Sequence, residues 1–279
     1  MVLASIVILF HVVASVILAG LYFRRYTMTR PPIGVFNLGD VAVMIGMVIL
    51  VPFLYLLLPI WMVIGLLTLV GLSILYFTWE PVLKSSWIIW LVTLVLAGGD
   101  LFTALVSDVN PVWFLAINNI VMVISVVGVT NLWAQSGMKA RHAAILGAAL
   151  AVYDLIATSL LPLMKDLFAR LDGLPFAPMI AWPISSAGQW LGVGLGDVVL
   201  AAVFPLVMRK AFGRTAGILA MAIGLGAIGL LILSALFGFV EIFPVMVVLG
   251  PLMVFQYAYW IRRCPERTTW QYLRAEPTK

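Results

Sequence analysis

Long apolar segments alternate with short polar ones along the whole chain. A helix that crosses a bilayer needs about 20 consecutive, mostly apolar residues. Counting with that length predicts nine spans, at approximately residues 2–23, 39–58, 59–79, 87–106, 111–133, 143–164, 189–208, 216–238 and 241–260. The pattern therefore predicts an all-α, polytopic membrane protein with nine transmembrane helices.

The division between the second and third predicted spans depends on a proline. Residues 41–79 form one apolar run that contains Pro52 and Pro59. The run is nearly twice as long as the roughly 20 residues of one crossing. Because proline interrupts a helix, we place the boundary at Pro59.

Composition supports a membrane protein with a single domain. The chain is 64% hydrophobic and 10% charged, whereas a soluble domain has about 25% charged residues. The first apolar segment lacks a basic leader and a clear cleavage site, so we expect it to be retained as a span. Residues 1–260 are predicted to form one membrane domain, and residues 261–279 a polar tail.

The distribution of basic residues predicts how the chain lies in the membrane. Assigning the loops alternately to two sides puts every Lys and Arg on one side except Lys165 and Arg170. By the positive-inside rule, the basic side is cytoplasmic. The N-terminus and the loop at about 165–188 are then outside, and the C-terminus is inside. The net charge of +5 reflects orientation and lipid contact rather than a nucleic-acid surface.

Three carboxylates fall well inside predicted spans: Asp100, Asp154 and Asp197. An ionised Asp at the middle of a bilayer costs about 2.5–3.5 kcal/mol. Every Lys and Arg lies in a loop, in the tail or at a span end, so no cationic partner is predicted. These acids must be protonated, hydrated in a cavity, or paired with each other.

Asp154 and Asp197 are predicted to lie at the same depth. At 1.5 Å per helical residue, Asp154 is about 15 Å before the end of the sixth span, and Asp197 about 12 Å into the seventh. Two carboxyl groups about 3 Å apart share one proton. One can then take a proton from water while the other donates to a carbonyl oxygen. The sequence thus permits an aspartyl dyad that needs neither a metal nor a cofactor.

The two acids stand in recognisable motifs. Tyr153–Asp154 ("YD") and residues 194–197 ("GLGD") resemble the signature motifs of the presenilin and signal peptide peptidase family, the GxGD intramembrane aspartyl proteases. Members of that family have nine spans. The resemblance is strong over residues 150–260 and rests only on the number of spans before that.

The family's third motif, Pro-Ala-Leu, opens the ninth span. Here Pro244, Val245 and Met246 stand at the matching position, and Pro251 follows seven residues later, as in signal peptide peptidases. Val245 and Met246 depart from the motif but keep its apolar character. A proline at this point also predicts an irregular helix start.

The resemblance implies a protease that cleaves transmembrane segments of other proteins, with Asp154 and Asp197 as the catalytic pair. The residues implied to form the active site or bind substrate are Tyr153, Gly194, Leu195, Gly196, Pro244, Val245 and Met246. The loop at 165–188 is too short for the long cleavable insertion of presenilins, so we expect one uncut chain without obligatory partner subunits. The predicted orientation matches signal peptide peptidases and implies substrates whose N-terminus is inside.

Local chemistry points in the same direction. Gly194 and Gly196 each cost a helix about 1 kcal/mol relative to alanine. An unwound helix start there would admit water and substrate beside Asp197, although glycines also allow spans to pack closely. The outer loop "GLPFAPMIAWP" (173–183) could lend an edge strand that holds the substrate extended.

Other interpretations fit less well. A proton-coupled transporter could use the same acids as a relay, but the expected inverted repeats are not evident. A prepilin-peptidase-like site would have a basic residue after the acid, where this chain has valine. Two histidines and one cysteine, Cys264, do not supply a zinc site without carboxylates. For Asp100 we expect a structural role, bonded to nearby backbone or to Asn118 or Asn119.

Overall fold

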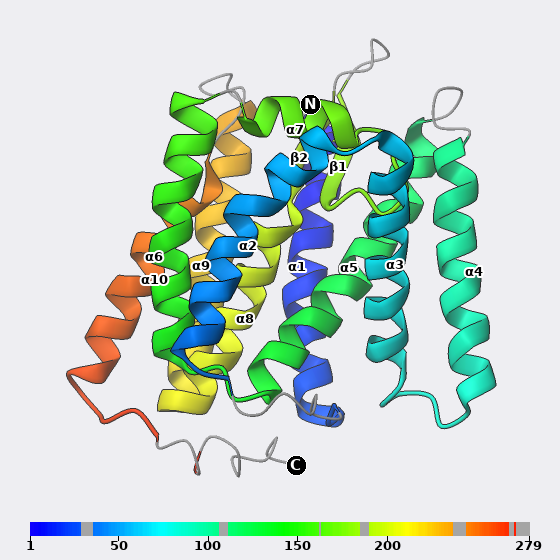
Figure 1. Ribbon diagram of the computed structural model, residues 1–279. Coiled ribbons are helices and arrows are strands. Elements are labelled where there is room, and N and C mark those ends of the chain that lie inside the picture. Colours follow the sequence, from blue (N-terminus) through cyan, green and yellow to red (C-terminus); the bar gives the residue numbers. More distant parts are fainter. Residues whose placement is uncertain are drawn as a thin grey trace.

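The computed structural model describes residues 1–28, 36–105, 111–161, 163–184, 190–236, 244–267 and 271. Figure 1 shows a bundle of helices with a small hairpin near one end. The α-helices are α1 (Val2–Arg25), α2 (Leu38–Leu57), α3 (Ile60–Trp79), α4 (Ser86–Leu105), α5 (Pro111–Gln135), α6 (Ala140–Asp154), α7 (Leu163–Leu171), α8 (Leu195–Phe212), α9 (Arg214–Leu236) and α10 (Val245–Ile261). A π-helical segment, η1 (Leu155–Leu160), continues α6, and strands β1 (Met179–Pro183) and β2 (Trp190–Gly194) form the hairpin.

Within the described part of the chain, seven helices are long and apolar enough to cross a membrane. They are α1 to α5, α6 together with the start of η1, and α9. The chain is therefore an α-helical, multi-pass membrane protein. The nine-span count is not confirmed, because α10 has 17 residues and α8 carries Asp197, Arg209 and Lys210 within 18 residues.

Some predicted boundaries are confirmed and others cannot be compared. The division at Pro59 is correct: α2 ends at Leu57, and Pro59 is the N-cap of α3. The predicted span ends at 106, 237–238 and 241–243 lie outside the described residues, as does most of the tail predicted over 261–279.

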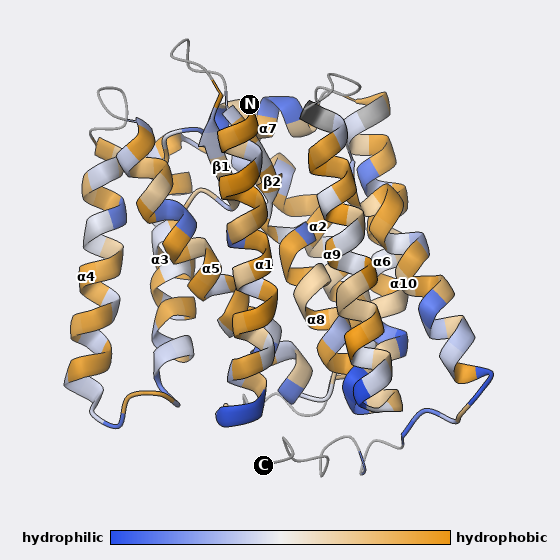
Figure 2. Cartoon of the chain, turned by 180° about the vertical axis from the view of Figure 1, so that it is seen from behind, coloured by the Kyte–Doolittle hydropathy of each residue, from blue (hydrophilic) through white to orange (hydrophobic). Residues whose placement is uncertain are grey.

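The centre of the bundle is formed by α5 and α8. Most side chains of both helices are buried, and α5 packs against α1, α3, α4, α8 and β1. The helices α2, α3 and α4 instead expose many large apolar side chains, and α4 lies at the edge of the bundle (Figure 1). Figure 2 shows hydrophobic residues over most of the helical surface. Such a surface suits contact with lipid rather than water.

Two predicted spans have a different local structure. The predicted sixth span, 143–164, begins earlier, at Ala140, and its α-helical part ends at Asp154. A π-helical segment follows, and α7 is a separate short helix. The predicted seventh span, 189–208, starts as strand β2, so helix α8 begins only at Leu195. Both changes occur beside the two aspartates. π-helical segments are often found at functional sites.

The ends of the bundle differ in charge. The N-terminus, α7 and the hairpin lie at one end (Figure 1). The C-terminal ends of α1 and α8 lie at the other end, where Arg209 is within electrostatic range of Arg24 and Arg214. The fold thus keeps most of the described basic residues away from the end that carries Lys165 and Arg170.

Candidate active site

Asp154 is held by one hydrogen bond from its own chain segment and one from α10. It is the last residue of α6, where α-helical turns give way to the π-helical segment. Its Oδ1 accepts a hydrogen bond from Thr158 Oγ1 at 2.9 Å, and its Oδ2 accepts one from the backbone N–H of Met246 at 3.0 Å. The carboxyl group is half-buried. The structure therefore places the Pro-Val-Met segment directly against this acid.

Small residues allow α10 to approach α6 closely enough for that contact. A Cβ atom added to Gly250 would lie 2.7 Å from Ala151 Cβ and 3.0 Å from the carbonyl carbon of Gly147. Both distances are shorter than an ordinary contact between carbon atoms, about 3.5–4.0 Å. Gly147 and Ala151 are one helical turn apart, the spacing by which small residues let membrane helices pack closely.

Asp197 lies on the facing helix. It belongs to the first turn of α8, whose N-cap is Gly194, and α6 packs against α8. The carboxyl group lies over Gly194: a Cβ atom at that glycine would be 3.4 Å from Asp197 Oδ2. Asp197 also lies within electrostatic range of Asp154. The two predicted acids, Gly194 and Met246 are thus gathered at one place in the bundle.

The other residues of the predicted site lie around this centre. Leu195 is the first residue of α8, and Gly196 is exposed with open space where a side chain would stand. Pro244 is the N-cap of α10, and Val245 is buried in its first turn. The hydroxyl group of Tyr153 is buried and has no hydrogen-bond partner in the described part of the chain.

The hairpin leads directly into the helix that carries Asp197. Strands β1 and β2 are antiparallel, with Met179 opposite Gly194 and Ala181 opposite Gly192. The N–H of Leu195 donates to the carbonyl oxygen of Pro178 at 2.9 Å, which fastens the start of α8 to the segment before β1. The extended backbone of residues 190–194 replaces the helical turns that the sequence predicted here.

The two edges of this hairpin differ in their hydrogen bonds. Ala181 in β1 exchanges hydrogen bonds with the side chain of Asn119, 3.0 Å for its N–H and 2.9 Å for its carbonyl oxygen. In an antiparallel pair, successive residues direct their backbone groups to opposite edges. Asn119 therefore occupies the outer edge of β1. Within the described residues no hydrogen bond is formed at the outer edge of β2, where Gly192 is exposed, and this is the free edge of the hairpin. The expected edge strand at 173–183 exists as β1, but its edge is covered.

Asp100 has a partner that the sequence did not single out. Its Oδ2 accepts a hydrogen bond from the backbone N–H of Phe176 at 2.6 Å. Asn118 and Asn119, the predicted side-chain partners, bond instead to the backbone of residues 177–181. Of the two expected alternatives, a bond to backbone and a bond to an asparagine, the structure shows the first.

Two features of the site, and one contact between α7 and α2, were missed from the sequence. Thr158 stands four residues after Asp154, a spacing at which helical side chains meet. Gly147 and Ala151 form a small-residue pair that points to close packing. Arg170 at the end of α7 donates to the carbonyl oxygens of Tyr55 and Leu58 at the C-terminal end of α2. The first two were visible in the spacing, and the third depends on tertiary structure.

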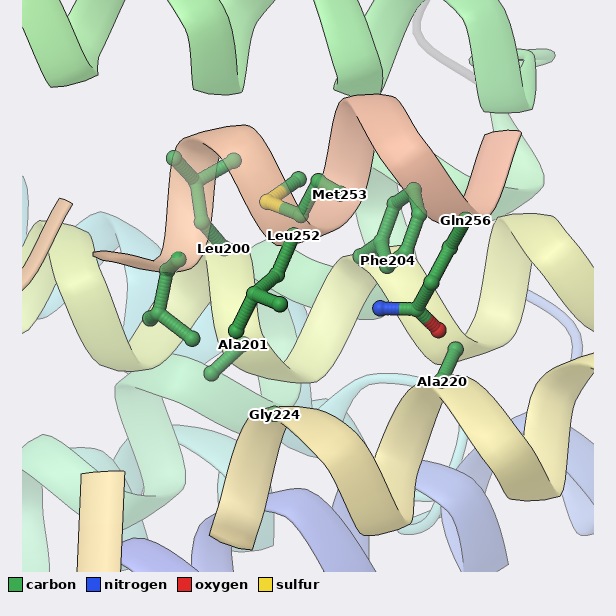
Figure 3. A pocket seen from close by; sticks show the side chains of 9 residues that line it. Leu200, Ala201, Phe204, Ala220, Gly224, Leu252, Met253 and Gln256 are labelled. Atoms are coloured by element: carbon green, nitrogen blue, oxygen red, sulfur yellow. The ribbon is translucent and has the colours of Figure 1, made fainter. Parts of the chain in front are cut away.

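A small apolar pocket lies further along α8 (Figure 3). It is formed between α8, α9 and α10, and Gln256 is its most polar side chain. Its lining residues are Leu200, Ala201, Phe204, Ala220, Gly224, Leu249, Leu252, Met253 and Gln256. Neither aspartate belongs to it, so the pocket is separate from the site described above.

Comparison of the chain with models of known protein families finds no match, and comparison with curated proteins finds none either. The functional interpretation therefore depends on the side chains of the site and on the motifs in which they stand.

Proposed function

We propose that this chain is an intramembrane aspartyl protease that hydrolyses peptide bonds within transmembrane segments of other proteins. The observation that carries the proposal is the placement of Asp154 at the end of α6 and of Asp197 in the first turn of α8, two helices that pack against each other and bring the acids within electrostatic range. The hydrogen bonds of Asp154 come from neutral donors, Thr158 and the amide of Met246. Two neighbouring acids that form no ion pair within the described residues are suited to sharing a proton.

The reaction follows from that shared proton. The ionised carboxylate takes a proton from a water molecule, whose oxygen attacks the carbonyl carbon of the substrate peptide bond. The protonated carboxyl donates its proton to the carbonyl oxygen, which gives a tetrahedral intermediate with two hydroxyl groups. In the collapse of this intermediate, the carboxyl that took the proton from water gives it to the departing nitrogen, and the other carboxylate takes a hydroxyl proton from the intermediate. The C–N bond breaks, and the starting protonation of the pair is restored. Which acid acts first is a property of the pair.

The substrate must be extended when it reacts, because a helical carbonyl group is hydrogen-bonded and shielded. The free edge of β2 offers the backbone partners that an extended segment needs. Gly192 lies on that edge, and Gly194 lies two residues on, beside Asp197 Oδ2. A substrate strand paired with β2 would therefore run towards the aspartates.

We further propose that α8 and α10 complete nine spans in the orientation given by the basic residues, with the N-terminus outside and the C-terminus in the cytoplasm. Substrates would then have their N-terminus inside. Cys264 is the only cysteine, so a membrane-impermeant thiol reagent applied to intact cells should spare it. In Cys264→Ser, a cysteine placed at Asp172 should react. If the cysteine at position 172 is labelled only after the inner face of the membrane is exposed, the orientation is the opposite of the one proposed.

The direct test is cleavage of a labelled transmembrane peptide by the purified chain in lipid nanodiscs. Asp154→Asn and Asp197→Asn should each lower the rate about 10²–10⁴-fold, the usual contribution of a general acid or base. Asp172→Asn is the matched control, because it makes the same change at an exposed acid. A transition-state mimic should block the wild type.

Two results would overturn the proposal. Full activity of either dyad variant would show that the acids are not catalytic. Proton flux in proteoliposomes that depends on both acids, with no cleavage of any peptide tested, would identify a transporter instead.

A further inference from the structure

Three polar side chains outside the aspartyl dyad converge on one short backbone segment. Asp100 on α4 and Asn118 and Asn119 on α5 are each 0% exposed. All three bond to backbone groups between residues 176 and 181. Polar groups buried in a membrane bundle are costly unless they are hydrogen-bonded, so their shared target indicates a common role.

The two asparagines take the place of a neighbouring strand. Asn119 satisfies both backbone groups of Ala181, as a paired residue on an adjacent strand would. Asn118 Nδ2 donates to the carbonyl oxygens of Ala177 and Met179, each at 3.1 Å. The outer edge of β1 is thereby bound to α5, a helix in the centre of the bundle.

Asp100 secures the turn that precedes β1. Its bond goes to the N–H of Phe176, which has a φ of 56°, a conformation that non-glycine residues seldom adopt. The ring of Phe176 packs where a side chain on Gly71 of α3 would otherwise be. The backbone bond and the ring contact together hold this residue in its strained conformation.

The bonds from Asp100, Asn118 and Asn119 to residues 176–181, which we call the hairpin clamp, also fix the strand next to Asp197. With β1 fixed to α5, the pairing of Met179 with Gly194 fixes the position of β2 next to Asp197. We propose that Asp100, Asn118 and Asn119 are positioning residues that hold the hairpin in place before substrate arrives, so that the edge of β2 determines which peptide bond reaches the aspartates. The inference rests on the proposed protease function, and the residues act through the hairpin without touching the reacting atoms.

The test compares two asparagines on one helix. Asn119→Ala removes the two bonds to β1. Asn131→Ala removes three bonds of another fully buried asparagine of α5: two that it donates to the carbonyl oxygens of Ala19 and Val127, and one that it accepts from Gln135 Nε2. Each variant is purified as the full chain in nanodiscs and given the same transmembrane peptide, and the products are identified by mass spectrometry. Asn118→Ala is a second variant of the clamp, for use if Asn119→Ala does not fold.

We expect Asn119→Ala to spread cleavage over neighbouring peptide bonds, so that the main wild-type product falls below half of the total and KM rises several-fold. Asn131→Ala should lower the yield of folded protein but keep the wild-type products. Deuterium exchange at the amides of residues 179–182 should rise in Asn119→Ala and not in Asn131→Ala.

The outcomes separate the two proposals. If the wild type cleaves and the clamp variants keep its product distribution, or share any change with Asn131→Ala, the positioning role is wrong and the protease function stands. If the wild type cleaves no peptide tested, the protease function fails and the positioning role fails with it.

Discussion

A single methyl group added at Gly250 should impair catalysis by moving α10 away from Asp154. In Gly250→Ala the new Cβ would lie 2.7 Å from Ala151 Cβ, whereas carbon atoms in contact are about 3.5–4.0 Å apart. The two helices must therefore separate locally by about 1 Å. The hydrogen bond from Met246 N–H to Asp154, now 3.0 Å long, would lengthen beyond the range of a hydrogen bond.

Two quantities follow from that displacement. Overpacking of this kind costs about 1–3 kcal/mol of stability. A misplacement of about 1 Å at a catalytic group can cost about 100-fold in rate, so we expect kcat to fall about 10- to 100-fold while the protein still folds.

The assay is cleavage of the transmembrane peptide in nanodiscs, with thermal unfolding measured on the same preparations. Gly226→Ala on α9 is the matched control, because a Cβ atom there has nothing within 4 Å and should be neutral or stabilising. If Gly250→Ala cleaves as fast as the wild type, the close approach of α6 and α10 does not position the acid, and the reasoning is refuted.

Three further predictions concern single contacts. Thr158→Val should lower kcat about tenfold, because a hydrogen bond to a carboxylate contributes about 1.5–3 kcal/mol, and Thr158→Ser should restore most of the rate. Arg170→Met should lower the free energy of unfolding by about 1–3 kcal/mol, because the carbonyl oxygens of Tyr55 and Leu58 lose their donor. Arg170→Lys should lower it less. Equal melting temperatures for the wild type and Arg170→Met would contradict this prediction. Asp100→Leu should destabilise the protein by about 1–3 kcal/mol because the N–H of Phe176 loses its acceptor, while Asp100→Asn, which keeps an acceptor oxygen, should melt near the wild type.

The position of the aspartates explains why the local fold departs from regular helix there. A peptide bond in a transmembrane helix is inaccessible to water, so the enzyme proposed here needs a site where both its own backbone and that of the substrate are irregular. The chain supplies this with η1 after Asp154 and β2 before Asp197. Lipid-facing backbone does not tolerate unpaired groups. Here η1 packs against α6 and α7, and β2 is paired with β1 and contacts α1.

The sequence by itself determined the membrane class, the positions of most spans and the three acids within apolar segments. Apolar length and the cost of a charge in lipid are local properties of the chain. It also indicated the boundary at Pro59 and an irregular backbone at the glycines before Asp197. It did not predict that α6 would end at Asp154, that residues 190–194 would form a strand, or that Asn119 would pair with Ala181.

Only the tertiary structure decided those features. Phe176 lies 76 residues from Asp100 and Met246 lies 92 residues from Asp154, so hydropathy along the chain carries no information about these bonds. A buried carboxylate or amide requires some hydrogen-bond partner. Which partner it finds depends on how closely the helices approach, and that distance is set by small residues such as Gly147 and Gly250 on elements far apart in the sequence.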